Sequence, residues 1–171
     1  MSGASCVFGC EVGYTLSGST TCYASTLTPG KCEPDPCLIV PPSHGSRGTC
    51  PDLASADNTL ESGSECTFDC DEGYSLSKNT TCLASVADRG TCDPDPCLNI
   101  SAPSDGNLGN CPSESLSSGS MCEFECNHGF TLSGSTSCLA GTLSRAMCVP
   151  DPCPTVTPPD HGALGSCGSS M

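Results

Sequence analysis

The hydrophobic residues of this chain alternate with polar residues over short segments and show no helical period. In residues 66–70 (CTFDC), the two cysteines and the phenylalanine fall on one face of an extended chain, while the polar residues fall on the other. Residues 122–126 (CEFEC) repeat this pattern. Clusters of Ser, Gly and Thr, such as residues 17–20 and 133–136, indicate turns. The pattern predicts short β-strands joined by turns.

Aromatic residues are few and recur at two positions of the pattern. The chain has no tryptophan, and aromatic residues make up 4% of it. Six aromatics occupy the two recurring positions: Phe8, Phe68 and Phe124 at the first, and Tyr14, Tyr74 and Phe130 at the second. Because burial of one ring contributes only about 2 kcal/mol, small modules need them all. We expect these six rings to form one miniature core in each repeat.

Cysteine spacing defines the repeat. The 18 cysteines include two sets of six with the same spacing from the third cysteine onward: Cys37, Cys50, Cys66, Cys70, Cys82 and Cys92, then Cys97, Cys111, Cys122, Cys126, Cys138 and Cys148. Four more, Cys6, Cys10, Cys22 and Cys32, match the last four positions of a copy, and Cys153 and Cys167 match the first two. This cysteine content is typical of small extracellular modules stapled by disulfides.

The repeat divides the chain into modules and linkers. We expect complete modules at residues 37–92 and 97–148, the C-terminal part of a module at 1–32, and the N-terminal part of one at 153–171. The linkers are residues 33–36, 93–96 and 149–152, each containing Pro-Asp-Pro. Two prolines in four residues favour a stiff, extended spacer. The sequence therefore predicts an elongated rod.

Charge and hydropathy exclude several partners. The formal net charge is −14, which repels nucleic acid and anionic lipid. The longest aliphatic run, residues 38–40, ends at two prolines, so no membrane insertion is expected. Residues 1–6 lack the basic start and apolar stretch of a secretion signal. With this many cysteines we expect a secreted or cell-surface protein whose signal was removed or lies upstream in a longer precursor.

Each copy resembles a sushi module, also called a complement control protein module. An opening cysteine is followed by Pro-Pro-Ser-His-Gly at residues 41–45, and a C-x-x-G-Y-x-L segment follows at 70–76. The resemblance implies small all-β disulfide-rich modules. Two features depart from the family: Leu27, Ala87 and Leu143 stand where a tryptophan is usual, and each copy has six cysteines rather than four. This variant is similar to tandem repeats in large extracellular proteins of microalgae and other protists.

Sushi connectivity, if carried over, joins the first module cysteine to the fifth and the fourth to the sixth, which leaves the extra pair to join each other. Six cysteines alone allow fifteen pairings, so this choice rests on the resemblance. The implied disulfides are Cys37–Cys82, Cys50–Cys66, Cys70–Cys92, Cys97–Cys138, Cys111–Cys122, Cys126–Cys148 and Cys10–Cys32. Each closes a loop and is worth roughly 3 to 4 kcal/mol in the chain-entropy model.

The same pairing leaves four cysteines in the part copies without partners. The two part copies complement each other, which leaves two explanations open: one period of a longer repeat chain, or a protomer whose tail completes the head of its neighbour. In the second case Cys6 would bond Cys167, and Cys22 would bond Cys153, between neighbours. Either case gives an open head-to-tail array. Closure of one chain into a ring is a third, less favoured explanation.

Several side chains are candidates for glycosylation or for calcium binding. The N-glycosylation sequons at Asn79 and Asn99, with Ser and Thr in the turns, predict covalent glycans. Two acidic sets, Asp69, Asp71 and Glu72, and the linker residues Asp35, Asp95 and Asp151, raise a calcium hypothesis. No calcium-loop spacing accompanies these carboxylates, so we favour a solvated acidic face and leave weak divalent-ion bridging open.

Catalysis and a structural metal are not expected. The three histidines, His44, His128 and His161, do not form one repeated set, and no nucleophile motif accompanies them. The closest cysteine pairs have three intervening residues, unlike CxxC zinc ligands. We therefore expect no enzyme and no cofactor.

Two function classes remain. The first is an extracellular structural protein, a glycosylated repeat that continues or assembles head to tail into a fibril of cell-surface or flagellar-hair type. The second is a sushi array that binds protein or glycan partners. A binding array tends to vary its exposed residues between modules, whereas here LSGST occurs at both residues 16–20 and 132–136. On this ground the sequence favours the structural class.

Overall fold

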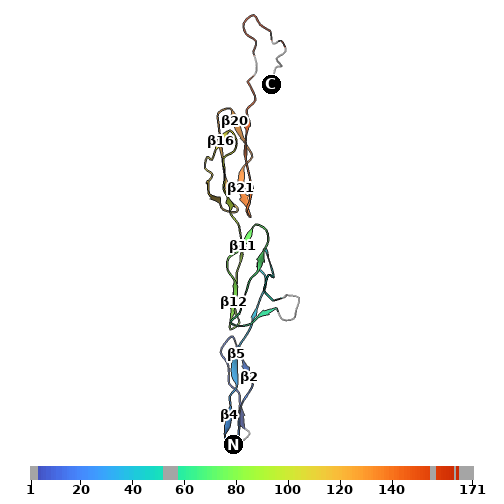
Figure 1. Cartoon of the computed structure of the whole chain (residues 1–171), viewed down its shortest axis with the longest axis vertical. Coiled ribbons are helices and arrows are strands. Elements are labelled where there is room, and N and C mark those ends of the chain that lie inside the picture. The colour runs from blue at the N-terminus through green and yellow to red at the C-terminus, as the bar shows by residue number, and fades with distance from the viewer. Residues whose placement is uncertain (1–3, 52–57, 155–156, 164, 166–171) are drawn as a thin grey trace. The chain divides into compact units, whose positions relative to one another are not determined.

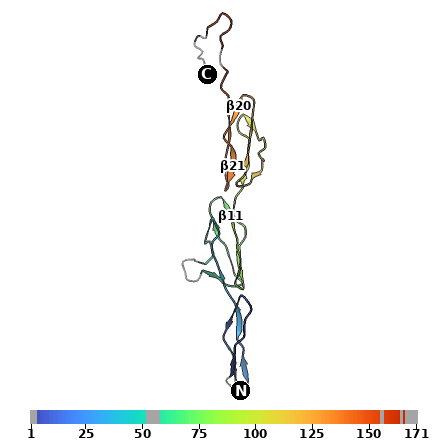
Figure 2. The same cartoon turned by 180° about the vertical axis from the view of Figure 1, so that it is seen from behind.

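The computed structural model describes residues 4–51, 58–154, 157–163 and 165, and consists of short β-strands and turns (Figure 1). The chain divides into two compact units, Met1–Pro94 and Asp95–Met171. The strand pairs of each unit can be followed from both sides in Figures 1 and 2. Within the described ranges no helix is present, as expected from the absence of a helical period.

The strands of the first unit are two to four residues long. They are β1 (Ala4–Cys6), β2 (Tyr14–Ser17), β3 (Thr20–Tyr23), β4 (Thr26–Thr28), β5 (Lys31–Pro34), β6 (Cys37–Leu38), β7 (Gly45–Ser46), β8 (Thr59–Leu60), β9 (Glu65–Cys66), β10 (Asp69–Cys70), β11 (Tyr74–Leu76), β12 (Thr80–Leu83), β13 (Val86–Asp88) and β14 (Cys92–Pro94).

The second unit repeats the series β6–β14. Its strands are β15 (Cys97–Leu98), β16 (Gly106–Asn107), β17 (Ser115–Leu116), β18 (Met121–Cys122), β19 (Glu125–Cys126), β20 (Phe130–Ser133), β21 (Thr136–Leu139), β22 (Thr142–Ser144) and β23 (Met147–Pro150). Strands β5, β14 and β23 run into the first proline of each Pro-Asp-Pro segment, so half of each expected linker is strand.

The two repeats at 37–92 and 97–148 share one topology of antiparallel pairs. In the first, β12 lies between β13 and β9, and the pairs β6–β8, β7–β10 and β11–β14 complete the fold. In the second, β21 lies between β22 and β18, with the pairs β15–β17, β16–β19 and β20–β23. The register agrees as well, because Cys37 pairs with Leu60 and Cys97 pairs with Leu116.

The single strand expected at residues 66–70 is two strands in the structure. Strand β9 ends at Cys66 and pairs with β12, whereas β10 begins at Asp69 and pairs with β7. The chain changes partner at Thr67 and Phe68, which interrupts the ladder. The predicted alternation of burial survives the break, since Cys66 and Phe68 are buried and Asp69 is exposed.

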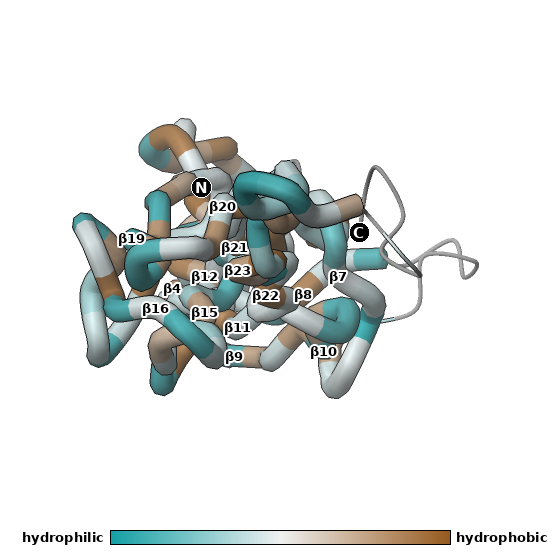
Figure 3. Tube along the Cα trace, turned by 90° about the horizontal axis from the view of Figure 1, so that it is seen from above, coloured by the Kyte–Doolittle hydropathy of each residue, from teal (hydrophilic) through white to brown (hydrophobic). Residues whose placement is uncertain are grey.

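Each repeat has its own small core, and hydrophobic and hydrophilic residues alternate at short intervals along the chain (Figure 3). In the first unit, Ile39, Leu60 and Phe68 pack with the half-cystines. In the second, Ile100, Leu116, Phe124 and Ala146 take these roles. About half of the buried residues in each core are therefore half-cystines and not large side chains.

The part of the chain before the first linker, residues 4–32, which we call the N-terminal segment, has only the second half of this fold. Its sheets β1–β3–β4 and β2–β5 correspond to β9–β12–β13 and β11–β14 of the next repeat. The expectation that all six recurring aromatics lie in miniature cores is wrong here: Phe8 is 57% exposed and Tyr14 is 38% exposed, whereas Phe68 is 3% exposed. Among its described residues, 4–32, no strand corresponds to β6 or β8, which contribute to the core of the next repeat.

The Pro-Asp-Pro segment after residue 32 is hydrogen-bonded on both sides. The Asp35 N–H donates to the Gly13 carbonyl at 2.8 Å, and the Ser85 N–H donates to the Asp35 carbonyl at 2.9 Å. A Cβ at Gly13, where φ is +86°, would lie 2.2 Å from the Ala84 carbonyl oxygen. Only glycine fits this close approach between the N-terminal segment and the β12–β13 turn.

Candidate functional site

Disulfides are the framework on which all candidate sites stand. The structure brings together seven cysteine pairs, with Cα–Cα distances from 4.9 to 5.8 Å: Cys10–Cys32, Cys37–Cys82, Cys50–Cys66, Cys70–Cys92, Cys97–Cys138, Cys111–Cys122 and Cys126–Cys148. These distances are typical of disulfides. They are the pairs that sushi connectivity implies.

Three cysteines of the described chain are free. Cys6 and Cys153 are exposed, and Cys22 is half-buried. Cys22 and Cys153 form no disulfide with each other within the chain, and Cys167, the expected partner of Cys6, lies outside the described residues. The corresponding cysteines of the next repeat, Cys66 and Cys82, are both bonded.

A pocket of about 310 Å³ lies beside Tyr14 in the N-terminal segment. It is lined by Gly9, Cys10, Glu11, Tyr14 and Cys32, and we call it the Tyr14 pocket. The disulfide Cys10–Cys32 forms part of its wall. An acidic or amide residue and an aromatic residue recur at this place in every copy, and in residues 37–92 they are Asp71 and Tyr74.

In residues 37–92 a loop fills the place that corresponds to the Tyr14 pocket. The His44 ring stacks on Tyr74, with centroids 4.1 Å apart and planes 10° apart. Its Nδ1 lies 3.8 Å from an Asp71 carboxylate oxygen, and the Asp71 N–H donates to the His44 carbonyl at 2.8 Å. Because both side chains are more than half exposed, the ion pair contributes little to stability.

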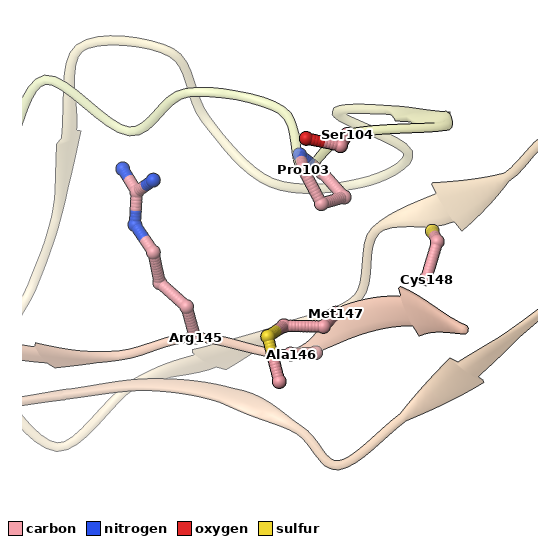
Figure 4. Close-up of a pocket in the computed structure, with 6 residues that line it drawn as sticks. All are labelled: Pro103, Ser104, Arg145, Ala146, Met147 and Cys148. Atoms are coloured by element: carbon pink, nitrogen blue, oxygen red, sulfur yellow. The ribbon is translucent and has the colours of Figure 1, made fainter.

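A second pocket, of about 350 Å³, lies in the second unit (Figure 4). Pro103, Ala146, Met147 and Cys148 line it with apolar surface, Ser104 adds a hydroxyl, and Arg145 extends along one side. The Arg145 guanidinium donates to the Ser101 hydroxyl at 2.9 Å. A guanidinium has five N–H donors, so this contact leaves others for a ligand. We call this the Arg145 pocket.

The pocket arginine recurs in the first unit. Arg89 occupies the same module position, three residues before the sixth cysteine, and donates to the Leu38 carbonyl at 3.1 Å. Two of the five cations of the chain therefore stand at one repeated position. Sequence reasoning missed both residues, although comparison of cations between the two copies would have found them.

The remaining predicted residues are dispersed over the surface. Asn79 and Asn99 are exposed, and the Ser101 hydroxyl of the second sequon is the acceptor for Arg145. The carboxylates Asp69, in β10, and Asp71 and Glu72, which follow β10, are exposed, and Asp151 accepts a hydrogen bond from Thr131. Among described residues, no three His, Cys, Asp or Glu side chains are grouped to hold a metal ion. No described helix is long and apolar enough to cross a bilayer.

Three relatives place the chain among known proteins, while no family model matches it. E-selectin of Rattus norvegicus is 32% identical over 152 residues, which are 83% of this chain and 27% of the relative. P-selectin of Mus musculus is 31% identical over 93% of the chain and 23% of the relative. Complement control protein C3 of Vaccinia virus (strain Western Reserve) is 30% identical over 79% of the chain and 54% of the relative.

The chain matches only part of each relative, which limits what can be inferred from the similarity. The chain spans about a quarter of the two selectins and about half of the viral protein. What it shares with them is the repeat, since these relatives carry sushi modules and the structure is all-β and rich in disulfides. The protein is extracellular, as are these relatives, and its repeats are sushi-like (complement control protein-like) modules.

Proposed function

We propose that the chain is a noncatalytic recognition segment of an extracellular protein, which binds a protein or glycan partner through an anionic group of that partner. The observation that carries the proposal is the Arg145 pocket and the recurrence of its arginine as Arg89. The similarity to selectins and to a complement control protein supports a recognition role over the structural class that the repeated turns favour.

The local chemistry suits a carboxylate or sulfate beside an apolar group. Arg145 is the one Lys or Arg in residues 95–171, so its guanidinium is the side chain of this unit that an anionic group would contact. Arginine can hold two oxygens of such a group at once. The apolar wall at Pro103 and Met147 would cover the uncharged part of the ligand.

Binding of a defined sulfated hexasaccharide tests this proposal. Titration calorimetry should show weak binding to the whole chain that falls with Arg145→Ala and with Arg89→Ala, and falls furthest in the double variant. Lys78→Ala is the matched control, because Lys78 is an exposed cation already paired with Asp88. Equal loss in all three single variants would mean that only net charge matters, and the proposal would be wrong.

Head-to-tail assembly is a second candidate function. Its support is that Cys6, Cys22 and Cys153 are free, although the corresponding cysteines of both complete repeats are bonded. A disulfide between Cys22 of one chain and Cys153 of the next would complete a module across two chains, and repetition would give a fibril. This proposal includes our division of the chain into modules at 37–92 and 97–148.

Electrophoresis of the oxidised chain under nonreducing conditions tests the assembly. A ladder of species that collapses to one 17.2 kDa band on reduction is the expected result. Cys22→Ser together with Cys153→Ser should shorten the ladder, and electron microscopy should show filaments for the wild type alone. A monomer band before reduction would exclude covalent assembly.

A further inference from the structure

We propose that the Tyr14 pocket binds the segment at residues 158–163 of a second copy of this chain, which we call the His-Gly turn. The proposal deepens the head-to-tail assembly and rests on it. It identifies a noncovalent contact, between described residues, that would hold two copies in register before any disulfide joins them.

The His-Gly turn already has the conformation of a docked loop. His161 has a φ of +63°, close to the +58° of His44, which is an uncommon conformation for a non-glycine residue. The Gly162 N–H donates to the Pro159 carbonyl at 2.8 Å, as the Gly45 N–H does to the Pro42 carbonyl at 3.1 Å. The turn therefore needs no rearrangement to resemble the loop at residues 41–46.

Exposure shows that the turn lacks the contacts of its counterpart. Residues 158–163 are all exposed, whereas Pro41, Pro42 and Gly45 are half-buried. The docked glycine packs closely on sulfur: a Cβ at Gly45 would lie 3.0 Å from the Cys92 Sγ, and one at Gly106 would lie 2.8 Å from the Cys148 Sγ. The equivalent sulfur in the N-terminal segment is that of Cys32, which is exposed.

The Tyr14 pocket contains residues at the positions that contact the loops of His44 and Asp105 in the two complete repeats. In both complete repeats an acidic or amide residue donates its backbone N–H to the loop, from Asp71 to His44 and from Asn127 to Asp105, each at 2.8 Å. Glu11 occupies that position in the N-terminal segment. The Tyr14 ring, which corresponds to Tyr74, would stack on His161 as Tyr74 stacks on His44.

Docking would also add a short antiparallel strand to the N-terminal segment. Gly45 and Ser46 pair with Cys70 and Asp69 through β7 and β10, and β16 pairs with β19 in the same way. The same register would place Gly162 opposite Cys10 and Ala163 opposite Gly9. Residues 9 and 10 are in no strand of the structure, so their edge is available for strand addition.

Cysteine trapping tests the register. In full-length chains that carry Cys6, Cys22, Cys153 and Cys167 as serine, one chain would carry Gly9→Cys and the other Ala163→Cys. A Cβ at Gly9 meets nothing within 4 Å, so that substitution is tolerated. Directly paired antiparallel residues lie about 4.5 to 5.5 Å apart at Cα, a distance that a disulfide spans. Mild oxidation of the mixture should give a heterodimer, with the seven native disulfides verified by mass spectrometry.

Thr157→Cys is the matched control, since it is exposed on the same tail and six residues out of register. Heterodimer with Ala163→Cys but not with Thr157→Cys supports the proposal. Equal trapping at both positions overturns it. If the variant with both Gly9→Cys and Ala163→Cys closes within one chain, and the mixture gives no heterodimer, a second copy is not the occupant.

A second measurement uses the ring stack. The NMR signals of the Tyr14 ring should shift as the concentration of the serine-substituted chain rises, and His161→Ala should weaken this association about two- to tenfold, the range expected for loss of one aromatic contact. A wild-type ladder with no trapping in register would leave the assembly standing and overturn only this contact. A wild type without a ladder would overturn the assembly itself.

Discussion

At the scale of single residues, a threonine recurs inside each repeat as a buried hydrogen-bond acceptor. Thr80 and Thr136 are fully buried, and Thr20 is 5% exposed. The Thr136 Oγ1 accepts the Ala146 N–H at 3.1 Å, and the Thr80 Oγ1 accepts the Gly90 N–H at 3.0 Å. This bond satisfies a backbone N–H for which the ladder provides no partner. The sequence signal is a threonine two residues before the fifth cysteine of each copy.

We expect Thr136→Val to lower the free energy of unfolding by about 1 to 3 kcal/mol, because the isosteric side chain leaves the buried Ala146 N–H without an acceptor. Urea unfolding measures this loss, and faster amide exchange at Ala146 would locate it. The exposed Thr142→Val should change neither quantity. If Ala146 exchange is unchanged in Thr136→Val, the hydrogen bond does not support the module.

The burial of the recurring aromatic residues could be predicted from the sequence in part. The burial of Phe68 and Phe124 follows from the alternation of apolar and polar positions. Phe8 also lies midway between two cysteines but is exposed, because burial depends on strands that pack over it from an earlier part of a module. A local pattern identifies the face on which a side chain lies; it does not identify what covers that face.

At the scale of elements, the disulfides staple loops of very different length. The extra bridge Cys111–Cys122 has a sequence separation of 11, whereas Cys97–Cys138 has a separation of 41. Chain entropy assigns these loops about 3 and about 4 kcal/mol respectively. Replacement of Cys111 and Cys122 by serine should therefore cost less stability than replacement of Cys97 and Cys138. Urea midpoints of the two variants measure the difference; the reverse order would contradict the loop-entropy account.

The hairpin β12–β13 contains a second element-scale feature. Its turn residues Ala84 and Ser85 have φ of +45° and +64°, although two-residue turns of this kind favour Asn-Gly. The corresponding turn of the next repeat has glycine at 141. Ser85→Gly should raise the free energy of unfolding by about 1 kcal/mol by removing left-handed strain.

Thermal unfolding checks this expectation. Ser115→Gly is the control, because Ser115 lies in strand β17, where glycine should destabilise the protein. A lower melting temperature for Ser85→Gly would show that the Ser85 side chain stabilises the turn more than its conformation costs.

The break of the predicted strand at Thr67 could not be predicted from the sequence. The chain pairs with β12 before the break and with β7 after it. This change of partner depends on the tertiary fold, which the alternation of apolar and polar residues along the chain does not encode.

At the scale of the whole molecule, cysteine spacing and the sushi resemblance predicted the all-β, disulfide-rich fold, and the relatives confirm the resemblance. The function was not predictable in the same way. The identical turn sequences at residues 16–20 and 132–136 favoured a structural protein, whereas the similarity to selectins and to a complement control protein favours recognition. The Arg145 pocket escaped prediction because its lining comes from residues 103–104 and 145–148, which only the fold brings together.

The proposed self-association responds to salt through the net charge of the chain. With a net charge of −14, copies of the chain repel each other, and this repulsion is screened as the Debye length falls from about 30 Å at 0.01 M to about 8 Å at 0.15 M salt. Self-association, followed by sedimentation velocity, should therefore strengthen over this range. Calcium chloride at equal ionic strength separates screening from divalent-ion bridging, since only bridging makes calcium more effective than sodium. Self-association that weakens with sodium chloride would show that attraction between unlike charges, and not docking of the His-Gly turn, holds the copies together.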